Sequence, residues 1–164
     1  MNISRRDCLK TVAAASSVPV FSTSLWAASE PTLEGASYGK YVTGPKLKKS
    51  QLKDRVIVFE YWGHRCGPCL ASIPHLCKLQ KKHGRDKLLI IANQVWTKNI
   101  AAAKQAWESR ATNKLVTVVN HGALKDVRVR GVPTCFVFDP KGKFVWKGHP
   151  RGGLDAAIDK ALKA

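Results

Sequence analysis

The sequence predicts an α/β fold in which one central mixed β-sheet is flanked by helices. Apolar segments rich in β-branched and aromatic residues alternate with segments of helical spacing, which is typical of this class. The last two apolar segments are separated by a short turn, so they predict a hairpin before a closing helix. The 164 residues are enough for one domain of about 100–150 residues. Hydrophobic residues at 45% and charged residues at 24% exclude disorder along the whole chain.

Each element is placed by its own pattern. Continuous apolar runs predict buried strands at 55–61, 87–95, 115–120, 135–138 and 144–147. Apolar residues three and four apart predict helices over 69–84, 99–110 and 154–162. A short helical turn is expected at 50–54 and a short helix or loop at 121–130. Residues 29–49, rich in Gly, Pro, Lys and Ser, predict a loosely ordered N-terminal extension before a domain over 50–164.

The chain is strongly basic, with 28 Lys and Arg against 11 Asp and Glu and a formal net charge of +17. Such a charge attracts nucleic acid, anionic membranes and acidic proteins. The basic residues are spread along the chain, without a stripe interleaved with aromatic residues and without metal-finger spacing. We therefore interpret the charge as a solvated surface and expect no nucleic-acid partner.

The first 28 residues have the pattern of an export signal. Arg5 and Arg6 are followed by an uncharged segment over 11–28 that ends in small residues. The run SRRDCLK resembles the twin-arginine export motif, although Cys8 stands where that motif usually has Phe. We expect cleavage near residues 27–29 and a periplasmic or other extracytoplasmic location, where disulfides persist. The alternative is an uncleaved amino-terminal membrane anchor.

The most informative motif is Cys66-Gly67-Pro68-Cys69. Two thiols in this spacing close a small disulfide at the start of a helix, where backbone N–H groups favour thiolate and lower the pKa of the first thiol. Cys66 is then the nucleophile that attacks a disulfide, and Cys69 resolves the mixed disulfide. A zinc site needs two further ligands at matching spacing, and no second pair follows, so no metal is expected.

These motifs resemble the thioredoxin family. The resemblance is carried by Tyr61-Trp62 at a strand end, by the CGPC motif, by Pro74 five residues after Cys69, and by Gly131-Val132-Pro133-Thr134. It covers residues 50–164 and implies the thioredoxin fold. With the export signal, the chain is most similar to the extracytoplasmic TlpA/ResA class.

The resemblance also implies roles for single residues. Pro133 corresponds to the cis-proline that faces the cysteine pair, and the backbone of Val132 is expected to pair with a substrate strand. Glu60 corresponds to a buried carboxylate with a raised pKa, which accepts a proton from Cys69. The lysine that thioredoxin pairs with this carboxylate has no counterpart here, so water or a hydroxyl is expected to hold Glu60.

Two residues are expected at the rim of the site. Trp62 is expected to pack in the core or in a groove, and also to wall the site and contact substrate. Arg65 stands where the family usually has Trp, which makes the rim more polar and more positive and favours acidic or polar partners. Cys77 and Cys135 lie in apolar patterns and are expected to be buried core residues.

The predicted function is an exported thiol–disulfide oxidoreductase that reduces protein disulfides and contributes to cell redox homeostasis. It needs no cofactor beyond its own cysteines. Its expected partners are protein disulfide or dithiol substrates and an unidentified electron donor, and a monomer is expected. The alternative is a thioredoxin-like binding module that docks an acidic partner and keeps a structural disulfide. A peroxide-reducing relative is disfavoured because no lone cysteine lies in a Pro/Thr-rich loop.

Overall fold

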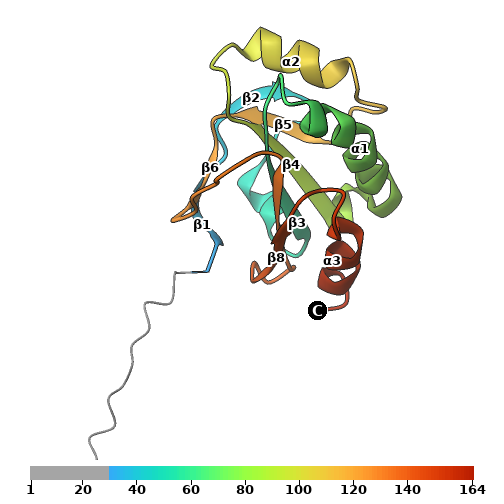
Figure 1. Cartoon of the computed structure of the whole chain (residues 1–164). Helices are drawn as coiled ribbons and strands as arrows, with labels where there is room; N and C mark the ends of the chain where they lie inside the picture. The colour runs from blue at the N-terminus through green and yellow to red at the C-terminus, as the bar shows by residue number, and fades with distance from the viewer. Residues whose placement is uncertain (1–29) are drawn as a thin grey trace, which may run out of the picture.

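The computed structural model describes residues 30–164, which form a six-stranded sheet, a two-stranded sheet and three helices (Figure 1). The larger sheet has the strand order β2-β5-β4-β3-β7-β8. Its strands are β2 (Lys40–Thr43), β3 (Val56–Trp62), β4 (Leu88–Gln94), β5 (Thr117–Asn120), β7 (Thr134–Phe138) and β8 (Phe144–Gly148). The smaller sheet pairs β1 (Thr32–Ser37) with β6 (Ala123–Lys125). The helices are α1 (Gly67–Lys87), α2 (Ile100–Glu108) and α3 (Leu154–Ala161), with a 3₁₀ turn, η1, at Lys49–Leu52.

The central sheet is mixed, as predicted. Strand β4 runs parallel to both β3 and β5, whereas β7 is antiparallel to β3 and β8 is antiparallel to β7. Every residue of β3 and β4 is buried. Strands covered on both faces lack polar alternation, which is why these two segments are continuous apolar runs in the sequence.

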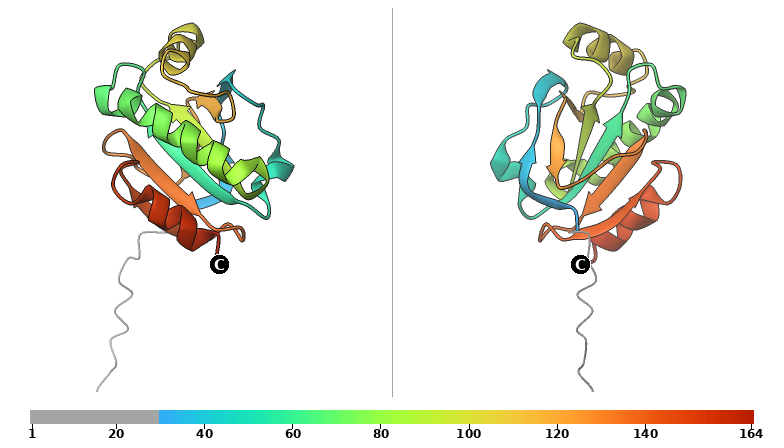
Figure 2. Two further views of the ribbon diagram at one scale, coloured as in Figure 1. Left: turned by 90° about the vertical axis from the view of Figure 1, so that its right-hand side faces the viewer. Right: turned by 60° about the vertical axis from the view of Figure 1, so that its left-hand side comes forward.

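Successive residues of β3 point to opposite faces of the sheet and divide the core in two. Val56, Val58 and Trp62 pack in one cluster with the buried side chains of α1, α2 and α3. Ile57 and Phe59 belong to a second cluster, which is covered by residues of β1, β6 and η1. Figure 2 shows α1 and α3 lying along the sheet, with the β1–β6 ribbon on another side.

Two expectations about the chain around the sheet were wrong. The segment 30–49 is not loosely ordered, because it contains β1 and β2, and β2 forms one edge of the central sheet through pairing with β5. Residues 123–125 form β6 instead of a helix or loop. In both segments the strand is stabilised by a partner far away in sequence, so a local pattern could not reveal it.

The predicted export signal and its cleavage site lie outside the described residues. Among residues 30–164, none of the helices combines the length and the apolar character that crossing a membrane requires.

Candidate functional site

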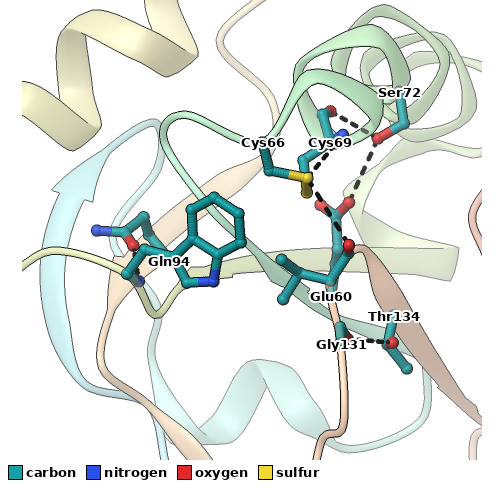
Figure 3. Close-up of a disulfide and its surroundings, with 9 residues drawn as sticks. Glu60, Cys66, Cys69, Ser72, Gln94, Gly131 and Thr134 are labelled. Carbon is teal, nitrogen blue, oxygen red and sulfur yellow. Dashed lines mark hydrogen bonds between the residues drawn. A yellow bond between two sulfur atoms is a disulfide. The ribbon is translucent and has the colours of Figure 1, made fainter.

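Cys66 and Cys69 form a disulfide at the N-terminus of α1, with their Cα atoms 5.2 Å apart (Figure 3). Cys66 is the N-cap residue, and the backbone N–H of Cys69 donates to its Sγ at 3.2 Å. Pro68 fits the first turn because the N–H that it lacks would have no helical partner there. Cys66 is 5% exposed and Cys69 is fully buried, so an incoming sulfur meets Cys66 first.

The loop before β7 approaches the same sulfur. The Val132–Pro133 peptide bond is cis, and the carbonyl oxygen of Val132 lies 3.7 Å from Sγ of Cys66. In the disulfide this sulfur carries no proton, so the approach is a van der Waals contact; a reduced thiol at this position could donate to the carbonyl. The hydroxyl of Thr134 donates to the carbonyl of Gly131 at 2.7 Å and closes the loop.

Glu60, on β3, is fully buried beneath the disulfide region. Burial raises its pKa from the usual 4.5 to about 8, and the hydroxyl of Ser72 opposes this shift. Its atom Oε2 has no hydrogen-bond partner within residues 30–164. The β4 residue paired with Glu60 is Ala92, which brings no cation to the carboxyl. At neutral pH the carboxyl is therefore mostly protonated.

Ser72 connects this carboxyl to the cysteine pair. Its hydroxyl donates to the carbonyl oxygen of Cys69 at 2.8 Å and lies 3.4 Å from Oε1 of Glu60. A hydroxyl has one proton, and the shorter contact is the better hydrogen bond. Ser72 is therefore the hydroxyl that contacts Glu60, through the longer of its two contacts.

The two remaining cysteines of the described chain are free and buried, as predicted. Cys135 pairs with Glu60 across the β3–β7 ladder. Burial, and then the neighbouring Glu60 carboxylate, raise the pKa of the Cys135 thiol well above its usual value, so this thiol stays protonated. Cys77, on α1, lies 3.9 Å from the carbonyl of Asn113.

The rim of the site differs from the sequence expectation. Arg65 is exposed, as expected. Trp62 is fully buried and packs against Trp107, with 5.3 Å between ring centroids. Its side chain has no surface with which to touch a substrate in this structure. Among residues 30–164, the exposed tryptophan is Trp96, just beyond β4, which lies against the backbone of Gly63.

Sequence reasoning missed Ser72, Gln94 and Trp96. Ser72 is a polar residue one helical turn after Cys69, on the mostly apolar buried face of α1, and that polarity was the available signal. Gln94 is the last residue of β4 and Trp96 lies just beyond it, next to the end of the parallel strand β3 that leads into the cysteine pair. Among the described residues, no three or more His, Cys, Asp or Glu side chains are grouped to hold a metal ion.

Comparisons with known proteins agree with this geometry. The chain is 25% identical over 125 residues to the thiol-disulfide oxidoreductase ResA of Bacillus subtilis, covering 74% of this chain and 70% of ResA. It is 28% identical over 106 residues to the thioredoxin-like protein YneN of the same organism, covering 63% of this chain and 61% of YneN. No family model matches the chain.

A solved structure supports the fold. The crystal structure of a thiol-disulfide isomerase from Corynebacterium glutamicum superposes with a TM-score of 0.64 at 16% identity, covering 76% of this chain and 92% of that one. The fold, the cysteine pair at the start of α1 and the two relatives together support a thioredoxin-like thiol–disulfide oxidoreductase of the ResA/TlpA type.

Proposed function

We propose that the protein reduces disulfides of other proteins by dithiol–disulfide exchange through Cys66 and Cys69. The observation that carries the proposal is the position of Cys66: it caps α1, receives the N–H of Cys69 and is the more exposed of the two sulfurs. A helix N-terminus stabilises a thiolate, which is the attacking species in thiol–disulfide exchange.

The reaction consists of two exchanges. The Cys66 thiolate attacks one sulfur of the substrate disulfide; a mixed disulfide forms, and the other substrate sulfur leaves as a thiolate that takes up a proton. The Cys69 thiol then loses its proton and attacks Cys66, which closes the Cys66–Cys69 bond and releases the second substrate thiolate. Two electrons pass from the protein to the substrate, and a donor dithiol must then return two electrons.

Glu60 is the proposed acceptor of the Cys69 proton. With a pKa of about 8 the carboxyl is ionised in a minority of molecules at neutral pH, and that ionised form is the one that takes up the Cys69 proton. The ionised fraction grows as pH rises toward 8. Its location inside the fold, joined to the Cys69 turn through Ser72, supports this role. Access for substrate is proposed at Pro133 and Val132, since the Val132 carbonyl lies beside Cys66 and can pair with an extended substrate segment.

The reducing direction rests on the Gly-Pro dipeptide between the cysteines, which matches thioredoxin. The test is the reduction potential of the purified chain, measured in thiol redox buffers by alkylation and mass. A potential near about −230 mV or lower is expected for a reductant. A potential between about −180 and −120 mV would indicate an isomerase or oxidant instead. Cys77→Ser is the matched control, because it removes a buried thiol outside the pair.

Export is part of the proposal. We propose a signal over residues 1–28, an extension over 29–49 and a thioredoxin-like domain over 50–164. The pairing of β2 with β5 indicates that the extension and the domain fold together. Accumulation of the chain in the periplasmic fraction, lost when Arg5 and Arg6 are both replaced by Lys, would support export by the twin-arginine route.

A further inference from the structure

The loop after β4 presents an aromatic side chain that the proposed reaction does not use. Trp96 is 54% exposed, which is unusual for a side chain that proteins bury on average. A Cβ atom on Gly63 would lie 2.4 Å from the Trp96 ring, so the indole rests on bare backbone. The carbonyl of that same Gly63 accepts the N–H of Cys66 at 3.0 Å. One face of the indole therefore covers the loop that leads to the reactive sulfur, and the rest faces solvent.

Trp96 is held in place by the side chain of Gln94. The Gln94 amide oxygen accepts the N–H groups of Trp96 and Thr97, and its amide nitrogen donates to the carbonyl of Thr97 at 2.7 Å and to Oδ1 of Asn120 at 3.1 Å. Gln94 is fully buried, and Figure 3 draws it on the side of the site where β4 ends. Three of these hydrogen bonds go to Trp96 and Thr97, and the fourth ties Gln94 to the end of β5. A buried amide bonded in this way preorganises what the loop presents, which lowers the entropy cost of binding.

The segments around the disulfide also share one sign of charge. Arg65 directly precedes Cys66, Arg130 lies two residues before Val132, and Lys98 lies two residues after Trp96; all three cations are exposed. Within residues 30–164 the ion pairs are His75–Asp155 and Lys82–Asp159, so none of the three is neutralised by a salt bridge. Glu60, the acid at the site itself, is buried. Exposed cations without salt-bridge partners, on three segments adjacent in sequence to residues of the site, favour the approach of anionic partners.

From these observations we propose that Trp96, Arg65, Arg130 and Lys98 form a recognition rim for polypeptide substrates whose disulfide cysteine is flanked by acidic side chains. The proposal rests on the proposed disulfide reduction and names its substrate class. Arginine binds carboxylates with two parallel hydrogen bonds, and an exposed, preorganised tryptophan is a frequent energetic centre of an interface. The thioredoxin family usually has a Trp at the position of Arg65. In this chain Trp96 supplies the aromatic surface of the rim, and the three cations add positive charge to it.

The test compares two disulfide-linked peptides of equal length, one with Asp and Glu around its cysteines and one with Lys and Arg. The readout is the ratio of kcat/KM for their reduction by the full chain. Since electrostatic steering changes association rates by about 10- to 1000-fold, we expect the acidic peptide to be favoured at least about tenfold at low salt. That preference should shrink as salt is added. The Arg65→Glu and Arg130→Glu exchanges should each lower the ratio, whereas Lys163→Glu, the same charge change at the end of α3, should not.

Trp96 has a separate readout. Trp96→Ala should raise KM for the acidic peptide, whereas Tyr41→Ala, which removes another exposed aromatic ring, should leave KM unchanged. Equal kcat/KM for acidic and basic peptides would overturn the recognition rim while leaving the proposed function standing. Tighter binding of single-stranded DNA than of the acidic peptide would overturn it as well, because the surface would then serve nucleic acid.

Failure of the proposed function has a different signature. It would appear as no reduction of either peptide or of the small neutral disulfide 2-hydroxyethyl disulfide. In that case, binding of the peptides to the recognition rim is measured by fluorescence anisotropy, with labelled peptides whose cysteines are S-alkylated. Tighter binding of the acidic peptide than of the basic one supports the rim, and equal binding overturns it.

Discussion

The hydroxyl oxygen of Ser72 lies 3.4 Å from Oε1 of Glu60, inside a core where that carboxyl meets no cation among residues 30–164. The same hydroxyl contacts the carbonyl oxygen of Cys69 at 2.8 Å. One neutral side chain thus contacts both the buried acid and the turn that carries the second cysteine. This arrangement makes the ionisation of Glu60 sensitive to a single hydroxyl group.

Replacing Ser72 by Ala should raise the pKa of Glu60 further, because the hydroxyl is the group that opposes the effect of burial. The expected result is an upward shift in the pH at which the Glu60 carboxyl titrates, followed by NMR of a ¹³C-labelled side chain. The pH profile of mixed-disulfide resolution should shift in the same direction. Ser109→Ala, at the exposed end of α2, is the control. An unchanged titration in Ser72→Ala would show that the 3.4 Å contact carries no energy.

Replacing Glu60 by Gln should flatten the pH dependence of stability. Burial raises the folded-state pKa from 4.5 to about 8, so the folded chain binds more protons than the unfolded chain between these values. The free energy of unfolding is therefore highest below the lower value and falls as pH rises through the window, with a slope on the order of 1 kcal/mol per pH unit.

Urea unfolding of the oxidised chain across this pH range measures the slope. Glu60→Gln should lack this part of the pH dependence and be more stable than the parent at the alkaline end. Equal slopes for both chains would contradict the raised pKa of the carboxyl.

The two cysteine variants should fail in different ways. Cys66→Ser removes the attacking sulfur and should lower peptide reduction by about a thousandfold or more, the scale typical for loss of a nucleophile. Cys69→Ser retains the attacking sulfur of Cys66 but lacks the thiol that resolves the mixed disulfide. The variant should therefore stay linked to the substrate through Cys66. Mass spectrometry after non-reducing quench detects the adduct. An adduct in Cys66→Ser but not in Cys69→Ser would reverse the assigned roles.

Replacing Gly63 by Ala should displace the Trp96 ring, since the new methyl group would lie 2.4 Å from it. The indole is half-exposed and can move, so the stability cost should stay at the low end of the roughly 1–3 kcal/mol that overpacking causes in a core. Indole Nε1–H NMR shifts and thermal unfolding report the two effects. Gly131→Ala, whose Cβ would meet no atom within 4 Å, is the control. An unmoved Trp96 resonance in Gly63→Ala would show that the ring does not rest on this backbone.

The parts of the fold that depend on local pattern were predictable. Strand β3, strand β4 and helix α3 appear within two residues of their expected bounds. The two strands are continuous apolar runs buried on both faces, and the helix shows the apolar spacing of one buried face. The disulfide between Cys66 and Cys69 also agrees with its motif, since the spacing and the helix N-terminus are both local properties.

The missed features all depend on pairing over long distances in sequence. β1 pairs with β6, and Gly-rich residues 30–49 carry no local sign of this partner. Trp62 was expected to wall the site and contact substrate but is fully buried, because α2 brings Trp107 against it. Trp96, the exposed tryptophan of residues 30–164, lies against the backbone of Gly63, a contact that no local pattern reveals.

The sequence by itself determined the α/β class, the central strands, the reactive cysteine pair and the excess of positive charge, because each is a property of residue type and short-range order. The tertiary structure decided which groups surround that pair. It buried Glu60 without a cation, placed Ser72 between the carboxyl and Cys69, and put Val132 beside Cys66. Such contacts depend on how strands and helices pack, and packing sets the burial and the hydrogen bonds on which the ionisation of a buried acid depends.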